Sequence, residues 1–192
     1  MRPTTSPATS RVPEDARPGL LVALLLVVAC ASPAGPERAG QGPAGGPART
    51  VTELYDLVTF SPGTTPDWDR VRALFVEEAV VVLRTGREEM SVFSLEGFVQ
   101  DFVQFIEQAN VEATGFTERI LELRVNRFGD WAQVLVRFES WIPDSGRAPS
   151  EGLDSFELIR RADGWRIVSI LNERPSADRP IPADLFRDRG LR

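Results

Sequence analysis

Residues 116–141 read FTERILELRVNRFGDWAQVLVRFESW, and apolar side chains alternate with polar ones on either side of Gly129-Asp130. Alternation with a period of two is typical of strands that have one buried face. Gly129-Asp130, with glycine at the first central position, suits a two-residue hairpin turn. The stretch therefore predicts a long antiparallel hairpin with strands at about 116–127 and 131–141.

The turn also predicts the register of this hairpin. It places Glu122 opposite Arg137 as a cross-strand ion pair on the outer, solvent-facing side. Apolar side chains then share the other face as three pairs: Val125 with Val134, Leu123 with Val136, and Leu121 with Phe138. A slip of one residue would turn one apolar row to solvent. Two independent features thus favour the same register.

The segments before the hairpin have helical periodicity. Thr50 and Glu53 form a T-x-x-E capping box, which predicts that a first helix begins at residue 50. Pro62-Gly63 ends it. Thr65 with Pro66 predicts the start of a second helix. Its inner face would carry four large apolar side chains: Trp68, Val71, Leu74 and Phe75.

Ser94 predicts the N-cap of a third helix, which extends to about residue 109. Short strands are expected at 80–83 and 90–93, and two longer ones at 152–161 and 165–173. Helices followed by a run of antiparallel strands indicate an α+β domain rather than alternating βαβ units.

The N-terminal segment predicts export. Residues 20–29 read LLVALLLVVA, an apolar run too short to span a bilayer as a helix, and it follows arginines at positions 2, 11 and 17. Cys30, the single cysteine, comes directly after Ala29 in a sequence similar to a bacterial lipobox. We expect residues 1–29 to be a lipoprotein signal peptide and Cys30 to be lipidated. The protein would then be anchored in a membrane of the cell envelope.

Residues 30–49 are rich in Pro, Gly and Ala and lack large apolar side chains, which predicts a disordered tether. The folded domain is expected over residues 50–186, with residues 187–192 as a tail. The net charge of −6 argues against nucleic-acid binding. The chain has no His and one Cys, which excludes His-based acid–base chemistry and cysteine zinc clusters. No metal and no cofactor is expected.

Several short motifs resemble an uncharacterised bacterial branch of the nuclear transport factor 2-like (SnoaL-like) superfamily over residues 50–186. They occur in the same order as in that superfamily: DWDR at 67–70, GFTE at 115–118, RFGDWA at 127–132, GLDSFEL at 152–158, GWRIVS at 164–169 and PIP at 180–182. The resemblance implies a cystatin-type cone, in which three N-terminal helices pack on a curved antiparallel sheet.

Members of the superfamily include isomerases, dehydratases, cyclases and epoxide hydrolases, beside non-catalytic binding and assembly domains, so the fold alone does not define a reaction. The dehydratases and many cyclases use His, which this chain lacks. The ketosteroid isomerases use Tyr with carboxylates, and the only tyrosine here is Tyr55. The Asp-Arg-Asp set of the epoxide hydrolases has no evident counterpart on one inner face.

Asp154 is the candidate catalytic residue. It has the same strand parity as Phe156 and Leu158, so its carboxyl is expected to face the apolar interior, where desolvation raises the pKa of an acid and suits a general base. The alternative is a half-solvated structural Asp near a strand end. A two-residue turn at Asp163-Gly164 would oppose Asp154 to Glu173, and a three-residue turn to Asn172.

The expected pocket is formed by side chains from the first two helices and the inner sheet face: Tyr55, Trp68, Phe138, Ser140 and Phe156. The preferred function is a membrane-tethered lipoprotein whose domain binds a small apolar ligand or takes part in assembly without catalysis. An enzyme that acts on a small apolar substrate through a carboxylate base is the alternative. A scaffold that pairs with another envelope protein is a third.

The outer face of the sheet predicts self-association. Trp131, Leu135 and Trp141 lie on the face opposite the core row, and contiguous apolar side chains on a surface commonly mark an interface. We therefore expect a homodimer through this face. In the alternative, the C-terminal segment with Ile181, Leu185 and Phe186 covers these residues within one chain.

Overall fold

A computed structural model describes residues 46–187. The expected signal peptide, Cys30, most of the tether and the last five residues lie outside this range. None of the described helices is long and apolar enough to cross a membrane. The described residues all belong to one compact unit, Arg38–Arg192, and both apolar core clusters are drawn from it. The chain from Arg38 onward therefore contains a complete core and is suited to separate production.

The order of elements begins with two helices. They are α1 (Pro47–Val58) and α2 (Trp68–Ala73), followed by β1 (Phe75–Arg84), β2 (Met90–Ser94), α3 (Leu95–Gln108) and the short 3-10 helix η1 (Val111–Ala113). Four long strands complete the domain: β3 (Thr117–Phe128), β4 (Trp131–Trp141), β5 (Ser150–Arg161) and β6 (Gly164–Glu173). The α+β class is confirmed.

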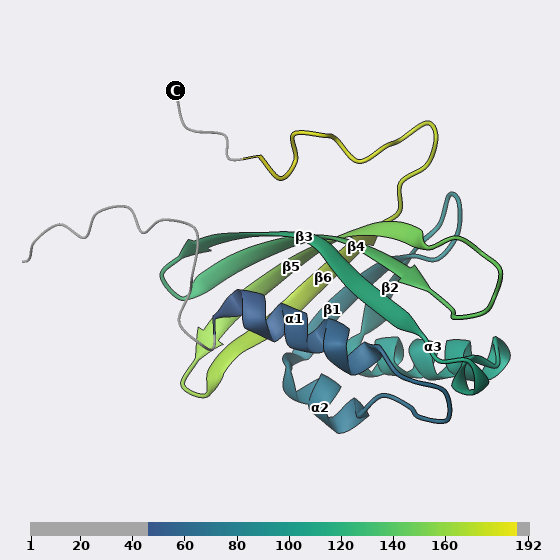
Figure 1. Cartoon of the computed structure of the whole chain (residues 1–192). Helices are drawn as coiled ribbons and strands as arrows, with labels where there is room; N and C mark the ends of the chain where they lie inside the picture. Colours follow the sequence, from purple (N-terminus) through teal and green to yellow (C-terminus); the bar gives the residue numbers. More distant parts are fainter. Residues whose placement is uncertain (1–45, 188–192) are drawn as a thin grey trace, which may run out of the picture. The chain divides into compact units, whose positions relative to one another are not determined.

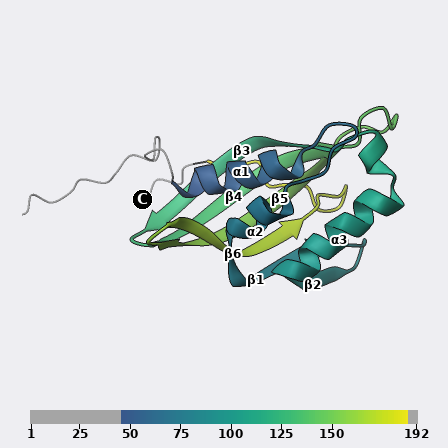
Figure 2. The same cartoon turned by 90° about the horizontal axis from the view of Figure 1, so that it is seen from below.

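The six strands form one curved sheet in the order β2-β1-β6-β5-β4-β3 (Figure 1). The sheet is mixed rather than wholly antiparallel, because β1 pairs with β6 in parallel while the other neighbours are antiparallel. Helix α1 packs on β3, β4 and β6, and α3 packs on β1 and β2. The view from below places both helices along the same face (Figure 2). The core lies between this helical layer and the inner sheet face.

The helix starts differ from those expected. Helix α1 begins at Pro47, three residues before Thr50, and Gly46 is its N-cap. Proline is well suited to the first helical turn, and Thr50 instead faces the core, so the capping box does not form. Helix α2 is capped by Asp67, whose side chain accepts from the Arg70 amide at 3.1 Å, rather than by Thr65. Phe75, expected on this helix, begins β1.

The register of the β3–β4 hairpin is confirmed near its turn. Val125 pairs with Val134, Leu123 with Val136, and Glu122 with Arg137, whose side chains form an ion pair at 3.2 Å. The third predicted apolar pair is wrong. Leu121 is the extra residue of a β-bulge, and Ile120 takes its place opposite Phe138. Because one extra residue reverses the alternation beyond it, residues 117–120 face the opposite way from the prediction.

A second bulge lies in β6. Arg161 pairs with Gly164 around a two-residue turn at Ala162-Asp163, and the register then shifts at Val168. This shift brings Asn172, not Glu173, opposite Asp154. The turn therefore differs from both alternatives considered from the sequence, because its centre lies one residue earlier and a bulge follows.

Candidate functional site

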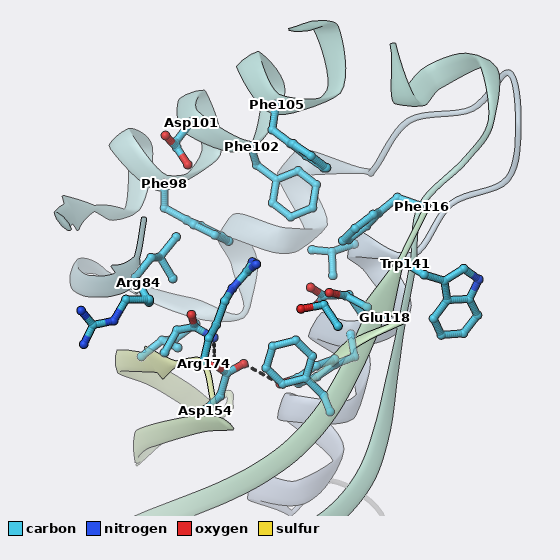
Figure 3. A pocket seen from close by; sticks show the side chains of 18 of the residues that line it. Arg84, Phe98, Asp101, Phe102, Phe105, Phe116, Glu118, Trp141, Asp154 and Arg174 are labelled. Atoms are coloured by element: carbon cyan, nitrogen blue, oxygen red, sulfur yellow. Dashed lines mark hydrogen bonds between the residues drawn. The ribbon is translucent and has the colours of Figure 1, made fainter. Parts of the chain in front are cut away.

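A cavity of about 590 Å³ lies between α1, α3 and the inner face of the sheet. Its upper wall is aromatic, with Phe98, Phe102 and Phe105 from α3 and Phe116 just before β3 (Figure 3). These rings meet edge to face, with Phe102 and Phe105 each less than 6 Å from Phe116 between ring centroids. Such a volume and lining are typical of pockets for small, largely apolar molecules.

Asp154 lies at the base of this cavity. Its carboxylate accepts a hydrogen bond at 2.6 Å from the Tyr55 hydroxyl on one oxygen, and one at 2.7 Å from the Asn172 amide on the other. All three residues are buried. Two neutral donors therefore orient the carboxylate, and each of its oxygens keeps a further lone pair for a ligand.

Burial raises the pKa of Asp154 to about 6, because desolvation disfavours the charged form. The hydrogen bonds from Tyr55 and Asn172 and the positive charge of Arg174 act in the opposite direction. Burial and the neighbouring Asp154 charge also raise the pKa of the Tyr55 hydroxyl well above its usual range, so Tyr55 stays protonated and donates. At neutral pH Asp154 is mostly ionised and poised to accept a proton.

Helix α1 places Tyr55 on its buried face, where the ring meets Phe138 and Phe156 edge to face at 5.6 and 6.2 Å between centroids. The end of the same helix is tied to β3, because the Thr59 hydroxyl donates to the Glu118 carbonyl and accepts from the Glu118 amide. The tyrosine hydroxyl and the start of β3 are therefore held in one fixed relation.

Glu118 supplies a second carboxyl to the cavity (Figure 3). Burial and the charge of Asp154 raise its pKa to about 8, and Arg174 acts against them. Its carboxyl has no hydrogen-bond partner among residues 46–187, so it is free to meet a ligand. Two acids with different pKa values beside one cavity are the arrangement that acid–base catalysis uses, one as base and one as acid.

The rim of the cavity is charged. Arg84 is held by Glu173 in a two-bond ion pair with distances of 2.9 and 2.6 Å, and these bonds lower the pKa of Glu173 to about 2. Arg147 and Arg174 also line the cavity, as does Asp101 of α3. Within residues 46–187, no three His, Cys, Asp or Glu side chains lie close enough together to hold a metal ion.

The structure brings most of the sequence-predicted site residues together. Asp154, Tyr55, Phe138, Ser140 and Phe156 all line the cavity. Trp68 does not. It packs edge to face against Phe102 at 5.5 Å, and so supports the wall from behind instead of forming it as expected.

Several polar lining residues were not singled out as pocket residues, and three of them lie around Asp154: Asn172, Glu118 and Arg174. Asn172 was an open alternative, and Glu118 and Arg174 had no assigned place in the pocket. Glu118 faces inward because of the Leu121 bulge, since regular alternation would have turned it to the outer face. As a result, Glu118 pairs with Ser140 in the observed register. The signal in the sequence is the adjacent pair of apolar residues Ile120-Leu121, which interrupts the alternation of apolar and polar side chains.

Residues 62–171, more than half of the chain, match the family model of the SnoaL-like domain, and the chain belongs to this family. An NTF2-like protein with a cystatin-like fold from Novosphingobium aromaticivorans superimposes with a TM-score of 0.54 at 17% identity, over 68% of this chain and 82% of that one. The match shows that the domain has the cystatin-like, NTF2-like fold.

An NTF2-like protein of unknown function from Pseudomonas putida superimposes with a TM-score of 0.55 at 11% identity, over 72% of this chain and 92% of that one. A candidate dehydratase of the NTF2-like family from Streptomyces avermitilis gives 0.53 at 15% identity, over 68% and 94%. At these identities the likeness shows the fold alone. A search of curated proteins found no match.

Proposed function

We propose that this domain binds a small, largely apolar molecule that donates a hydrogen bond to Asp154. The observation that carries the proposal is the Asp154 carboxylate, which two buried donors orient at the base of a cavity of about 590 Å³. The carboxylate is buried and held by protein donors, yet it also borders the open, aromatic-lined space of the cavity. The unused lone pairs of its two oxygens favour a hydroxyl or amide donor on the ligand.

The test uses the chain from Arg38 onward and the fluorescent probe N-phenyl-1-naphthylamine, a neutral, mainly apolar donor. We expect the probe to bind and Ser140→Trp, which fills the cavity, to abolish binding. Ser155→Trp is the matched control, because Ser155 lies between Asp154 and Phe156 on β5 and so faces the other side of the sheet. If the cavity-filling variant binds the probe as well as the control does, the proposal is wrong.

A second candidate is acid–base catalysis, and the different pKa values of the two cavity acids favour it. Asp154, with a pKa of about 6, would take a proton from a carbon next to a carbonyl group. Glu118, with a pKa of about 8, would donate a hydrogen bond to the carbonyl oxygen as negative charge develops there.

Proton transfer of this type is measurable without the natural substrate. The protein should accelerate exchange of the α-protons of 2-tetralone in D₂O, followed by NMR, and Asp154→Asn should remove the acceleration because it keeps the shape but discards the base. Binding of the neutral probe by the same variant is the control for folding. Equal exchange with the wild type and Asp154→Asn would leave binding as the function.

The proposed location is the cell envelope, with the domain tethered to a membrane through lipidated Cys30. The support is the sequence around Cys30, which lies outside the described residues. In a bacterial host, the full-length chain should incorporate an alkyne analogue of palmitate, and Cys30→Ala should not. Incorporation that is the same in both, or absent from the wild type, would contradict lipidation.

The proposed homodimer through the outer sheet face is supported by the exposure of Trp131, 44% of whose surface is accessible. The competing arrangement is supported by the C-terminal segment, since Arg124 of β3 donates to the Leu185 carbonyl at 2.8 Å. Light scattering of the chain from Arg38 onward distinguishes the two. A dimer that Trp131→Glu dissociates supports the first, and a monomer at high micromolar concentration contradicts it.

A further inference from the structure

Arg174 is a cationic residue that lines the cavity and points into it from beside Asp154 and Glu118 (Figure 3). It follows the end of β6, two residues after Asn172, and its side chain extends from near Asp154 into the open space below the aromatic wall (Figure 3). Its positive charge interacts with both acids and lowers the pKa of Asp154 and of Glu118. Arg174 is exposed to solvent, so its guanidinium can meet a bound molecule at the opening of the cavity.

The Arg174 guanidinium differs from those of Arg84 and Arg179 in what it contacts. Arg84 is committed to Glu173, and Arg179 contacts the same carboxylate at 3.2 Å. Within residues 46–187 the Arg174 guanidinium makes no hydrogen bond and no ion pair at contact distance. Only its backbone is engaged. The Arg174 amide donates a hydrogen bond to the Glu173 carboxylate, and the Arg174 carbonyl accepts one from the Arg179 guanidinium. Its donors are therefore available to a ligand.

Because their pKa values are raised, the two acids oppose an anionic partner of Arg174 less than two full negative charges would. With pKa values of about 6 and about 8, Asp154 and Glu118 together carry little more than one negative charge at neutral pH. Arg147, a second cavity arginine, likewise has no ion pair within the described residues. A guanidinium presents a planar set of N–H donors that matches the two oxygens of a carboxylate or the oxygens of a sulfonate.

These placements divide the cavity into three zones. The aromatic side chains of α3 and Phe116 form an apolar zone, Asp154 with Tyr55 and Asn172 forms an acceptor zone, and Arg174 forms a cationic zone between them and the rim. We infer that the ligand is an amphipathic monoanion, with a rigid apolar body against the phenylalanines and a carboxylate-type head group on Arg174. This inference rests on the proposed function and names its ligand class.

The experiment compares two probes that share the same rings. 1-Anilinonaphthalene-8-sulfonate is N-phenyl-1-naphthylamine with an added sulfonate, so the difference in their binding reports the anionic group alone. The chain from Arg38 onward is titrated with each probe, as wild type and as Arg174→Gln. Arg161→Gln is the matched control, because it removes the same charge at the far end of β5, away from the cavity. Loss of binding in the cavity-filling variant Ser140→Trp shows that each probe binds in the cavity.

We expect Arg174→Gln to weaken binding of the sulfonate probe roughly tenfold or more, the usual size of a lost charge-assisted hydrogen bond, and to leave the neutral probe within about twofold. Arg161→Gln should change neither. Equal weakening of both probes, or no weakening of the sulfonate probe, overturns the anionic ligand while leaving the binding pocket intact. Binding of neither probe to the wild type overturns the proposed function as well.

Discussion

At the end of the sheet near the β3–β4 and β5–β6 turns, the inward-facing side chains are apolar and fully enclosed, as for Val134, Leu158 and Ile167. At the other end the inward-facing positions include Glu118, Asp154 and Asn172, and a cavity replaces the packed core. We call these the sealed end and the cavity end. The two ends belong to the same strands and differ in the bulges at Leu121 and Val168.

The difference teaches how a polar site can be built on an apolar hairpin. Along β6, Trp165 and Ile167 face the core before the bulge, and Ile170 and Asn172 face it after the bulge. Without the shift, Leu171 and Glu173 would point inward instead. The Leu121 bulge acts in the same way on β3, where it turns Glu118 toward the cavity. One extra residue in each strand thus exchanges the inner and outer rows.

The largest effect is expected from a cavity made in the sealed end. Leu158 is fully buried opposite Ala132, so Leu158→Ala should lower the free energy of unfolding by about 2–5 kcal/mol. Leu171→Ala is the control, because half of the Leu171 surface is exposed and the change should cost much less. Urea unfolding measures both. Similar losses for the two variants would contradict the contrast between enclosed and open positions.

The stability of the protein and the pKa of Asp154 should both depend on the Tyr55 hydroxyl group. Tyr55→Phe keeps the ring contacts with Phe138 and Phe156 but removes the donor to Asp154, so stability should fall by about 1–3 kcal/mol. Since the hydrogen bond from Tyr55 lowers the pKa of Asp154, its loss should raise that pKa above about 6. Carbon-detected NMR of the Asp154 carboxyl measures the shift. An unchanged or lower value would show that the bond does not hold the charge.

Above pH 5, the free energy of unfolding should depend on pH because of the two acids at the cavity end, and not because of the sealed end. Both pKa values are raised on folding, from 3.8 to about 6 for Asp154 and from 4.5 to about 8 for Glu118, so the folded chain binds more protons in this window. The free energy of unfolding should therefore fall as pH rises from about 5 to about 9. Glu173, with its pKa lowered to about 2, adds stability with rising pH only below that window.

Glu118→Gln should flatten the upper half of this profile, between about pH 7 and pH 9, because the group with the higher pKa is gone. Glu122→Gln, on the same strand but on the outer face, should leave the profile unchanged. Thermal unfolding at a series of pH values provides the measurement. A wild-type stability that rises across the upper half would mean that Glu118 is ionised without cost.

The smallest effect is expected on the outer face, where Arg137 forms the cross-strand ion pair with Glu122. Arg137 contacts Glu122 at 3.2 Å and Glu151 at 3.0 Å, and all three side chains are partly exposed. Exposed ion pairs contribute about 0–1 kcal/mol, so Arg137→Gln should change stability by no more than that. Chemical denaturation in low and high salt measures it. A loss comparable to that of Leu158→Ala would contradict a surface role.

Much of the fold is readable from local patterns. The alternation in residues 116–141 predicted the hairpin, and the pairing of Glu122 with Arg137 predicted its register near the turn, because both depend on neighbours within one pair of strands. The helix starts were less accurate, since Gly46 and Asp67 compete as N-caps with Thr50 and Thr65 only a few positions away. The parallel pairing of β1 with β6 joins segments about ninety residues apart, and no local pattern indicates it.

By itself the sequence determined that Asp154 faces the interior, because its parity follows from Phe156 and Leu158 on the same strand. It also determined which side chains were available, with Tyr55 as the sole tyrosine and no histidine. Only the tertiary structure decided that Asn172 and Glu118 join Asp154. The reason is that a bulge inserts one unpaired residue at a point that depends on packing across the sheet, and every residue beyond it changes face.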